Sequence, residues 1–187
     1  MAESTESWRN TNRTLRILEN AVKDNYGLCH ERGISVEAES GRNNGGEDGI
    51  ADTCDLEALF TSTEEVEDFL RAGIDILAPS VGNIHGDYGP SGPEIDLARL
   101  SSIDEQIRGR AVMALHGIND FTAEIMRNCI KAGAVKLSVN KLLLEVWHVH
   151  SKENTRRHFM QRVDEGIEIL QAEVERWTDI CGSASKA

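Results

Sequence analysis

Apolar and polar residues alternate in blocks along the chain, and the blocks predict strands separated by helices. Stretches with apolar residues three or four positions apart have helical spacing. Between them lie short apolar runs with the length and β-branched content of strands. The strands are expected at 34–39, 74–81, 110–117 and 134–140, and the helices at 63–71, 94–108, 122–132 and 141–150. Because nearly continuous apolar strands that alternate with helices form parallel sheets covered by those helices, we expect an α/β fold.

The two ends of the chain are predicted to be helical. Residues 8–31 have apolar side chains at helical spacing, and residues 154–180 form a long amphipathic pattern. Its expected apolar face consists of Val163, Ile167, Leu170, Val174 and Trp177. We expect a single domain with a leading helix in 1–33, four strand–helix units in 34–150 and a terminal helix in 151–187. Within it, the Gly- and Asn-rich residues 40–49 are expected to form a loop, and Thr63 to cap the helix that follows.

Charge and composition narrow the classes of function. The chain has 187 residues, with 20 Lys and Arg against 32 Asp and Glu, so its net charge is −12. Such a surface repels phosphate backbones, which argues against a general nucleic-acid or anionic-membrane binder. No apolar stretch reaches the length of a membrane span, and the polar N-terminus predicts that there is no secretory signal. The four scattered cysteines, Cys29, Cys54, Cys129 and Cys181, are expected to be reduced thiols in a cytoplasmic protein.

Polar residues of a chemically useful kind stand at the end of each predicted strand, namely Glu39, His85, His116 and Asn140. The carboxyl ends of parallel strands meet at one edge of a sheet, where α/β proteins build their active sites. A histidine pair with a carboxylate suits zinc, because neutral imidazole is the commonest metal ligand. A single histidine at a strand end is more often only a hydrogen-bonded residue, so that alternative stays open beside the metal site.

Two further features support a site at this edge. A glycine follows each histidine, at Gly86 and Gly117, and leaves room for the approach of a substrate. Glu37 and Glu39 alternate with apolar residues and so share one face of the sheet. A carboxylate inside a fold is costly unless a metal ion or a charged partner faces it.

Four segments together resemble a known family. GISVEAESGRNNGGEDG, GIDILAPSVGNIHGDYGPSGPEIDLARL, MALHGINDF and AGAVKLSVNKLLL are similar, in order and spacing, to the second half of class II fructose-bisphosphate aldolases. These are zinc-dependent enzymes with a TIM-barrel (β/α)8 fold. The resemblance covers roughly residues 12–150. It implies that the four predicted strands correspond to strands five to eight of such a barrel, whose complete form typically needs about 250 residues.

The resemblance also implies roles for individual residues. His85 and His116 match two of the family's zinc-binding histidines, and Glu39 matches a carboxylate that holds Zn²⁺ in an alternative position. Glu47 matches the acid that handles a proton on the substrate carbon. Positions that hold the dihydroxyacetone-phosphate half of the substrate correspond to Gly86, Gly117 and Asn140. The implied reaction is the reversible aldol cleavage of fructose 1,6-bisphosphate to dihydroxyacetone phosphate and glyceraldehyde 3-phosphate, with zinc as a Lewis acid.

Departures from the family pattern leave alternatives open. The family's third zinc histidine and its adjacent catalytic aspartate, on strand three, have no counterpart in this sequence. In the loop after His116, Asp120 would repel a phosphate unless it points away. The chain is therefore also compatible with a non-catalytic metal-binding or assembly protein, or with an aldolase for another ketose phosphate such as tagatose bisphosphate. A half-barrel exposes two sheet edges, so we expect either a fragment of a longer chain or a homodimer.

Overall fold

A computed structural model describes residues 27–40, 60–85, 88–153 and 155–186, and it contains a parallel sheet of four strands. The strands β1 (Glu37–Ser40), β2 (Ile76–Pro79), β3 (Val112–Leu115) and β4 (Ala134–Leu137) lie in the order of the sequence. This confirms the predicted α/β fold with a parallel sheet. Each strand is shorter than the apolar run that predicted it. Most of the expected leading helix, and all of the expected loop except Ser40, lie outside the described residues.

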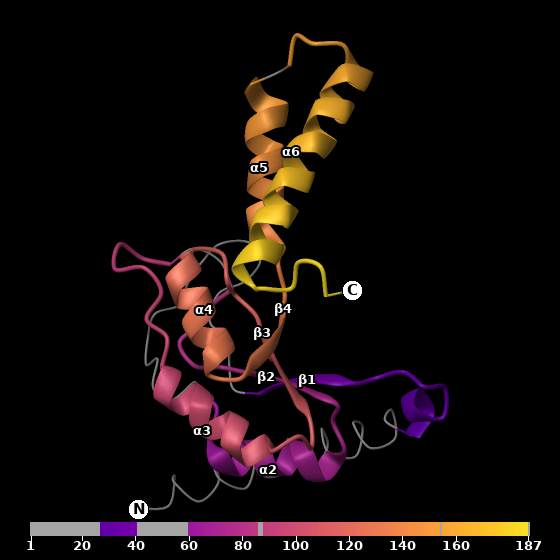
Figure 1. Ribbon diagram of the computed structural model, residues 1–187. Coiled ribbons are helices and arrows are strands. Elements are labelled where there is room, and N and C mark those ends of the chain that lie inside the picture. Colours follow the sequence, from indigo (N-terminus) through magenta and orange to yellow (C-terminus); the bar gives the residue numbers. More distant parts are fainter. Residues whose placement is uncertain (1–26, 41–59, 86–87, 154, 187) are drawn as a thin grey trace, which may run out of the picture.

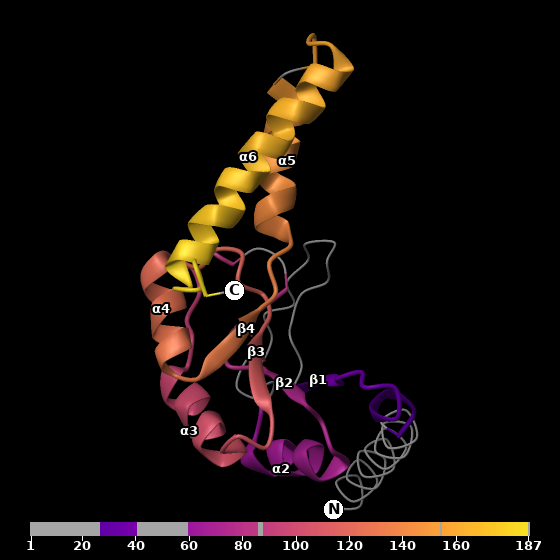
Figure 2. The same cartoon turned by 45° about the vertical axis from the view of Figure 1, so that its right-hand side comes forward.

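The helices fall into two groups. Helices α2 (Thr63–Ala72), α3 (Leu97–Ile107) and α4 (Ala123–Lys131) follow β1, β2 and β3, and all three lie on one side of the sheet (Figures 1 and 2). Helices α5 (Lys141–Glu153) and α6 (Phe159–Ile180) run side by side and project away from the sheet. Among the described helices, none has the length and apolar character needed to cross a bilayer.

The N-cap of helix α2 lies one residue earlier than the sequence pattern suggests. Its N-cap is Ser62 rather than Thr63, because the extended backbone of Ser62 lets its hydroxyl accept a hydrogen bond from the Glu65 amide. The Glu65 carboxylate accepts in return from the Ser62 amide at 2.8 Å, which completes a capping box. The prediction of Thr63 as the cap was therefore wrong, although the helix itself is where the sequence places it.

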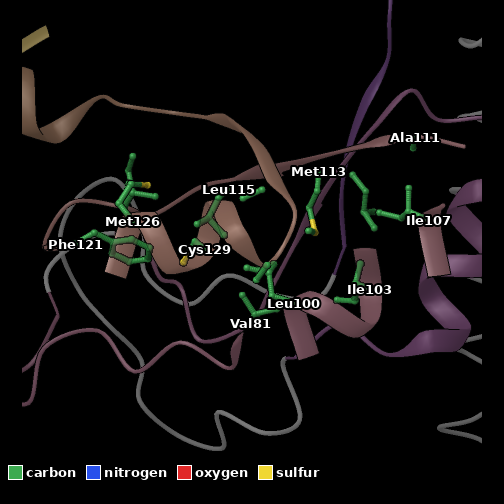
Figure 3. Packing of buried hydrophobic residues seen from close by; sticks show 14 of the residues in the cluster. Val81, Leu100, Ile103, Ile107, Ala111, Met113, Leu115, Phe121, Met126 and Cys129 are labelled. Carbon is green, nitrogen blue, oxygen red and sulfur yellow. The ribbon is translucent and has the colours of Figure 1, made fainter. Parts of the chain in front are cut away.

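In the described residues, an apolar core lies between the sheet and helices α2 to α4, and the end of α6 reaches it through Trp177 and Ile180. Met113 and Leu115 of β3 lie among side chains of α3 and α4, including Leu100 and Cys129 (Figure 3). The sheet contributes one side of its strands to this core. We call that side the helix face and define it by Ala38, Leu77, Met113, Leu115, Ala134 and Leu137. The core fixes the strands against one another, and with them the loops at their carboxyl ends.

The predicted apolar face of the terminal helix is correct only in part. Trp177 is buried, but Ile167 and Val174 are 55% and 47% exposed. The reason is that α6 packs along α5 over most of its length, while only its end, with Trp177 and Ile180, joins the apolar core beside α4. At Gly166 an added Cβ would lie 2.3 Å from the Trp147 ring, so glycine is what allows the two helices to approach.

The other side of the sheet carries the polar side chains, and its residues follow from the strand register. Glu37 pairs with Ile76, Glu39 with Ala78, and Ala114 with Lys136. Since paired residues of neighbouring strands share a face, these side chains lie opposite the helix face. We call this side the site face and define it by its residues Glu37, Glu39, Ala78, Ala114 and Lys136.

Strand β4 contains an irregularity that decides which side Lys136 occupies. Ala134 pairs with Met113, whereas Lys136 pairs with Ala114, so the register shifts by one residue between these pairs. Val135 is the additional residue, and it is 68% exposed. Without the shift, Lys136 would lie opposite Leu115 on the helix face. The bulge therefore places a cation on the site face.

Candidate metal centre

Three side chains from three neighbouring strands converge above the site face. Glu39 belongs to β1, His85 lies in the loop after β2, and His116 directly follows β3. The Nε2 atom of His85 lies 3.5 Å from Oε1 of Glu39, and Nδ1 of His116 lies 3.4 Å from Oε2 of Glu39. The two imidazole rings are nearly perpendicular, with centroids 5.8 Å apart. The predicted convergence of these strand ends is thus present in the fold.

The geometry of this trio fits a bound divalent cation. One ligand atom from each residue can be chosen so that all three lie within 4.8 Å of one another. Ligands at about 2.1 Å from a tetrahedral ion lie about 3.4 Å apart. Each histidine has a ring nitrogen at about this distance from Glu39, although the two contacts involve different carboxylate oxygens. Two neutral imidazoles and one carboxylate are a donor set that catalytic zinc sites use, with a fourth position left for water or substrate. Glu39, His85 and His116 therefore form a possible metal site, which we call the Glu39–His85–His116 trio.

A second carboxylate approaches the trio from the side. Oε1 of Glu37 lies 2.8 Å from Nε2 of His116, and its other oxygen accepts a hydrogen bond from the Lys136 ammonium. Burial raises the pKa of Glu37, but the hydrogen bonds and charges of Lys136 and His116 outweigh it and hold this pKa below its ordinary value. Glu37 is therefore ionised at neutral pH. Its charged partner is Lys136, in agreement with the expectation that a carboxylate on this face needs a metal ion or a charged partner.

Hydrogen bonds join the two loops that carry the histidines. Nδ2 of the buried Asn83 donates to the His116 carbonyl at 3.2 Å. The Tyr88 hydroxyl accepts from the Ile84 amide at 3.0 Å and donates to the Gly117 carbonyl at 2.7 Å. Burial raises the pKa of Tyr88, so its phenol remains a hydrogen-bond donor throughout the physiological pH range. These contacts fix the distance between the His85 loop and the His116 loop.

Gly117 is required by the contact between the same loops. Its φ angle is +63°, and an added Cβ would lie 2.3 Å from the Ile84 carbonyl oxygen. In the sequence, a glycine after the histidine indicated room for a substrate. The structure gives it a second reason, since the backbone of one loop lies directly against the backbone of the other.

Replacing Tyr88 with phenylalanine should destabilise the chain through these two loops. The ring and its contact with Phe121 would remain, while the Ile84 amide and the Gly117 carbonyl would both lose a partner. Leaving such groups unsatisfied costs about 1–3 kcal/mol, so the free energy of unfolding in urea should fall by that amount. An unchanged urea midpoint would show that the hydroxyl does not hold the loops together.

The remaining predicted site residues are placed differently. Asn140 is exposed and directly precedes α5, where its carbonyl accepts from the amides of Leu143 and Leu144. The carboxylate of Asp120 accepts from the Tyr88 amide at 3.1 Å, so in this structure it is engaged by the neighbouring loop. Glu47 and Gly86 lie outside the described residues.

Sequence reasoning missed the residues that support the trio. Asn83 and Tyr88 lie two residues before and three residues after His85, in a loop whose Gly and Pro content gives no periodic signal. Lys136 sits in an apolar strand pattern and faces the site only because of the bulge in β4. The one usable signal was a lone charge within an otherwise apolar run.

Comparison with known proteins agrees with this arrangement. Residues 16–186 match the family model described as fructose-bisphosphate aldolase class-II. A Coccidioides immitis protein provisionally named a fructose-bisphosphate aldolase is 42% identical over 160 residues, covering 85% of this chain and 53% of the relative. The crystal structure of a provisionally named fructose-1,6-bisphosphate aldolase from C. immitis superposes with a TM-score of 0.83 at 38% identity, covering 91% of this chain and 60% of that one.

A more distant structure shares the fold. The YdjI aldolase from Escherichia coli K12 gives a TM-score of 0.78 at 23% identity, covering 92% of this chain and 59% of that one. The chain thus spans about half the length of the curated relative it matches. The match to the family model nevertheless runs through all four strands and both histidine loops. On these grounds, the chain belongs to the class II fructose-bisphosphate aldolase family.

Proposed function

We propose that this chain provides the metal-binding half of a class II aldolase, a lyase that reversibly cleaves a phosphorylated ketose. The observation that carries the proposal is the convergence of the Glu39–His85–His116 trio at the carboxyl ends of three adjacent strands. Family membership supports the reaction class. Fructose 1,6-bisphosphate is the proposed substrate, with dihydroxyacetone phosphate and glyceraldehyde 3-phosphate as the products.

The proposed roles divide between holding the ion, binding the substrate and moving a proton. Glu39, His85 and His116 would hold Zn²⁺, which when bound supplies a Lewis acid for the substrate carbonyl. Gly86 and Gly117 would let the substrate lie close to the backbone beside the histidines, and Asn140 would bind its phosphorylated triose half. Glu47 would take or return the proton on the carbon next to the carbonyl.

The proposal extends to architecture and location. We propose that the domain is the C-terminal half of a (β/α)8 barrel, with β1 to β4 as strands five to eight, and that it works in the cytoplasm. The Glu37–Lys136 bond supports a barrel, because it joins side chains of β1 and β4, the first and last strands in the sheet order. A strongly curved sheet brings such side chains together across its concave face. The complementary strands would come from a longer form of the chain or from a second copy.

Zinc binding and turnover by the purified chain test the function together. Calorimetric titration is expected to give one Zn²⁺ per chain, and release of triose phosphate from fructose 1,6-bisphosphate should depend on that ion. One bound Zn²⁺ without turnover would favour the second candidate, a non-catalytic metal-binding or assembly protein. Faster release from tagatose bisphosphate would reassign the substrate. A chain that binds no Zn²⁺ would overturn the proposal.

A further inference from the structure

We propose that Glu37, held by Lys136, is a positioning residue that fixes the proton of the His116 ring on Nε2 and so keeps Nδ1 available as a metal ligand. The inference rests on the proposed metal site. It concerns two residues outside the trio: Glu37, which the sequence pattern places on the face of Glu39 without a role, and Lys136, which the pattern does not connect with the site.

The hydrogen-bond partners of His116 set its tautomer. A neutral imidazole donates from one nitrogen and accepts, or binds a metal, through the other. Oε1 of Glu37 lies 2.8 Å from Nε2, whereas Oε2 of Glu39 lies 3.4 Å from Nδ1. Both carboxylates can only accept, and the shorter contact assigns the proton to Nε2. Nδ1 then presents its lone pair on the side where Glu39 and His85 lie. Carboxylate–histidine–metal arrangements of this kind are common around protein metal sites.

Lys136 prevents the carboxylate from turning away. Its ammonium binds Oε2 of Glu37, which leaves Oε1 directed at His116. Lys136 reaches this position because the bulge at Val135 puts it on the site face. The side chains of Glu37 and His116 are 24% and 18% exposed, so water competes little for their hydrogen bond, whereas Lys136 is half exposed.

The same geometry predicts an unusual effect of Glu37→Gln. Lysine can only donate, so it would bind the amide oxygen of the new glutamine. The amide nitrogen, which also only donates, would then face Nε2 of His116. That ring nitrogen would have to accept, and the proton would move to Nδ1, the atom needed for the metal. Glu37→Gln should thus reverse the tautomer, although it removes only a charge.

The first measurement is long-range ¹H–¹⁵N NMR of the histidine rings in the metal-free chain, at a pH where the imidazoles are neutral. His116 is expected to carry its proton on Nε2 in the unaltered chain and on Nδ1 in Glu37→Gln. Glu67→Gln is the matched control, since it also replaces a carboxylate that forms an ion pair. That pair joins Glu67 of α2 to Arg110, away from the trio. A proton on Nδ1 in the unaltered chain, or an unchanged tautomer in Glu37→Gln, would overturn the inference.

The second measurement is the affinity for Zn²⁺. Glu37→Gln should weaken it about 10- to 100-fold, the usual range for such outer partners, and Glu67→Gln should leave it unchanged. Adding Lys136→Met to Glu37→Gln frees the amide to turn, so part of the affinity should return. Equal affinity of Glu37→Gln and the unaltered chain would refute the positioning role. If the unaltered chain binds no Zn²⁺, the metal-site proposal fails, and the ring NMR still decides whether Glu37 sets the tautomer.

Discussion

His116→Ala is expected to weaken Zn²⁺ binding by more than about 100-fold, beyond the range typical of outer partners of metal ligands. His116 is the residue on which the site depends most, because Nδ1 faces Glu39 while Nε2 is held by Glu37. Its removal takes away one of three ligands and leaves Glu37 and Glu39 on one face without the ring between them. Isothermal titration with Zn²⁺ measures the loss directly.

A second histidine provides the control for this variant. His148 is exposed on α5, so His148→Ala removes an imidazole without touching the trio. It should bind Zn²⁺ as the unaltered chain does, and its urea unfolding should also be unchanged. Comparable losses in the two alanine variants would mean that Zn²⁺ binds nonspecifically to surface imidazoles, and would contradict a site at the strand ends.

Gly117→Ala is expected to be the most destabilising of the substitutions considered for the two histidine loops. A side chain at a φ of +63° costs about 1–3 kcal/mol by itself. The added Cβ would also lie 2.3 Å from the Ile84 carbonyl oxygen and 2.7 Å from its carbon, so the loops must separate. Both effects should lower the free energy of unfolding in urea. Because His116 is the preceding residue, the affinity for Zn²⁺ should fall as well.

Gly33→Ala separates the two contributions. Gly33 has a φ of +67°, almost the same as Gly117, but open space surrounds the position of its Cβ. This control should therefore show only the backbone cost, without loss of Zn²⁺ affinity. The difference between the two variants measures the contact between the loops. Equal destabilisation would show that the loops can yield, and the loop contact would then have no role in placing His116.

The sequence predicted the order of the elements better than it predicted the detail of the site. The alternating apolar blocks predict four strands and the helices between them. They do so because each strand carries apolar side chains, such as Leu77 and Met113, that are buried against the helices. The positions of His85 and His116 after predicted strands likewise predict that both lie at the same edge of the sheet. These features follow from local sequence, because a parallel sheet always brings its carboxyl ends together.

Other features depend on contacts between distant segments. Glu37 and Lys136 are separated by 99 residues, and their ion pair depends on sheet curvature and on the bulge. The Tyr88 hydroxyl bridges two loops that carry no periodic pattern. The exposed positions of α6 were predicted wrongly for a similar reason. Amphipathic spacing shows which residues share one face of a helix, but not how much of that face another element covers.

The bulge in β4 also bears on how this strand tolerates changes in length. One extra residue, Val135, is accommodated between Ala134 and Lys136 while the pairs on either side keep their partners. Deleting Val135 would leave an ordinary ladder in which Lys136 still lies opposite Ala114 and next to Glu37. Deleting a residue inside β3 would instead turn the residues beyond it toward the opposite side of the sheet, His116 among them. In relatives, single-residue gaps should accordingly be found at Val135 and be absent from the strand that leads to His116.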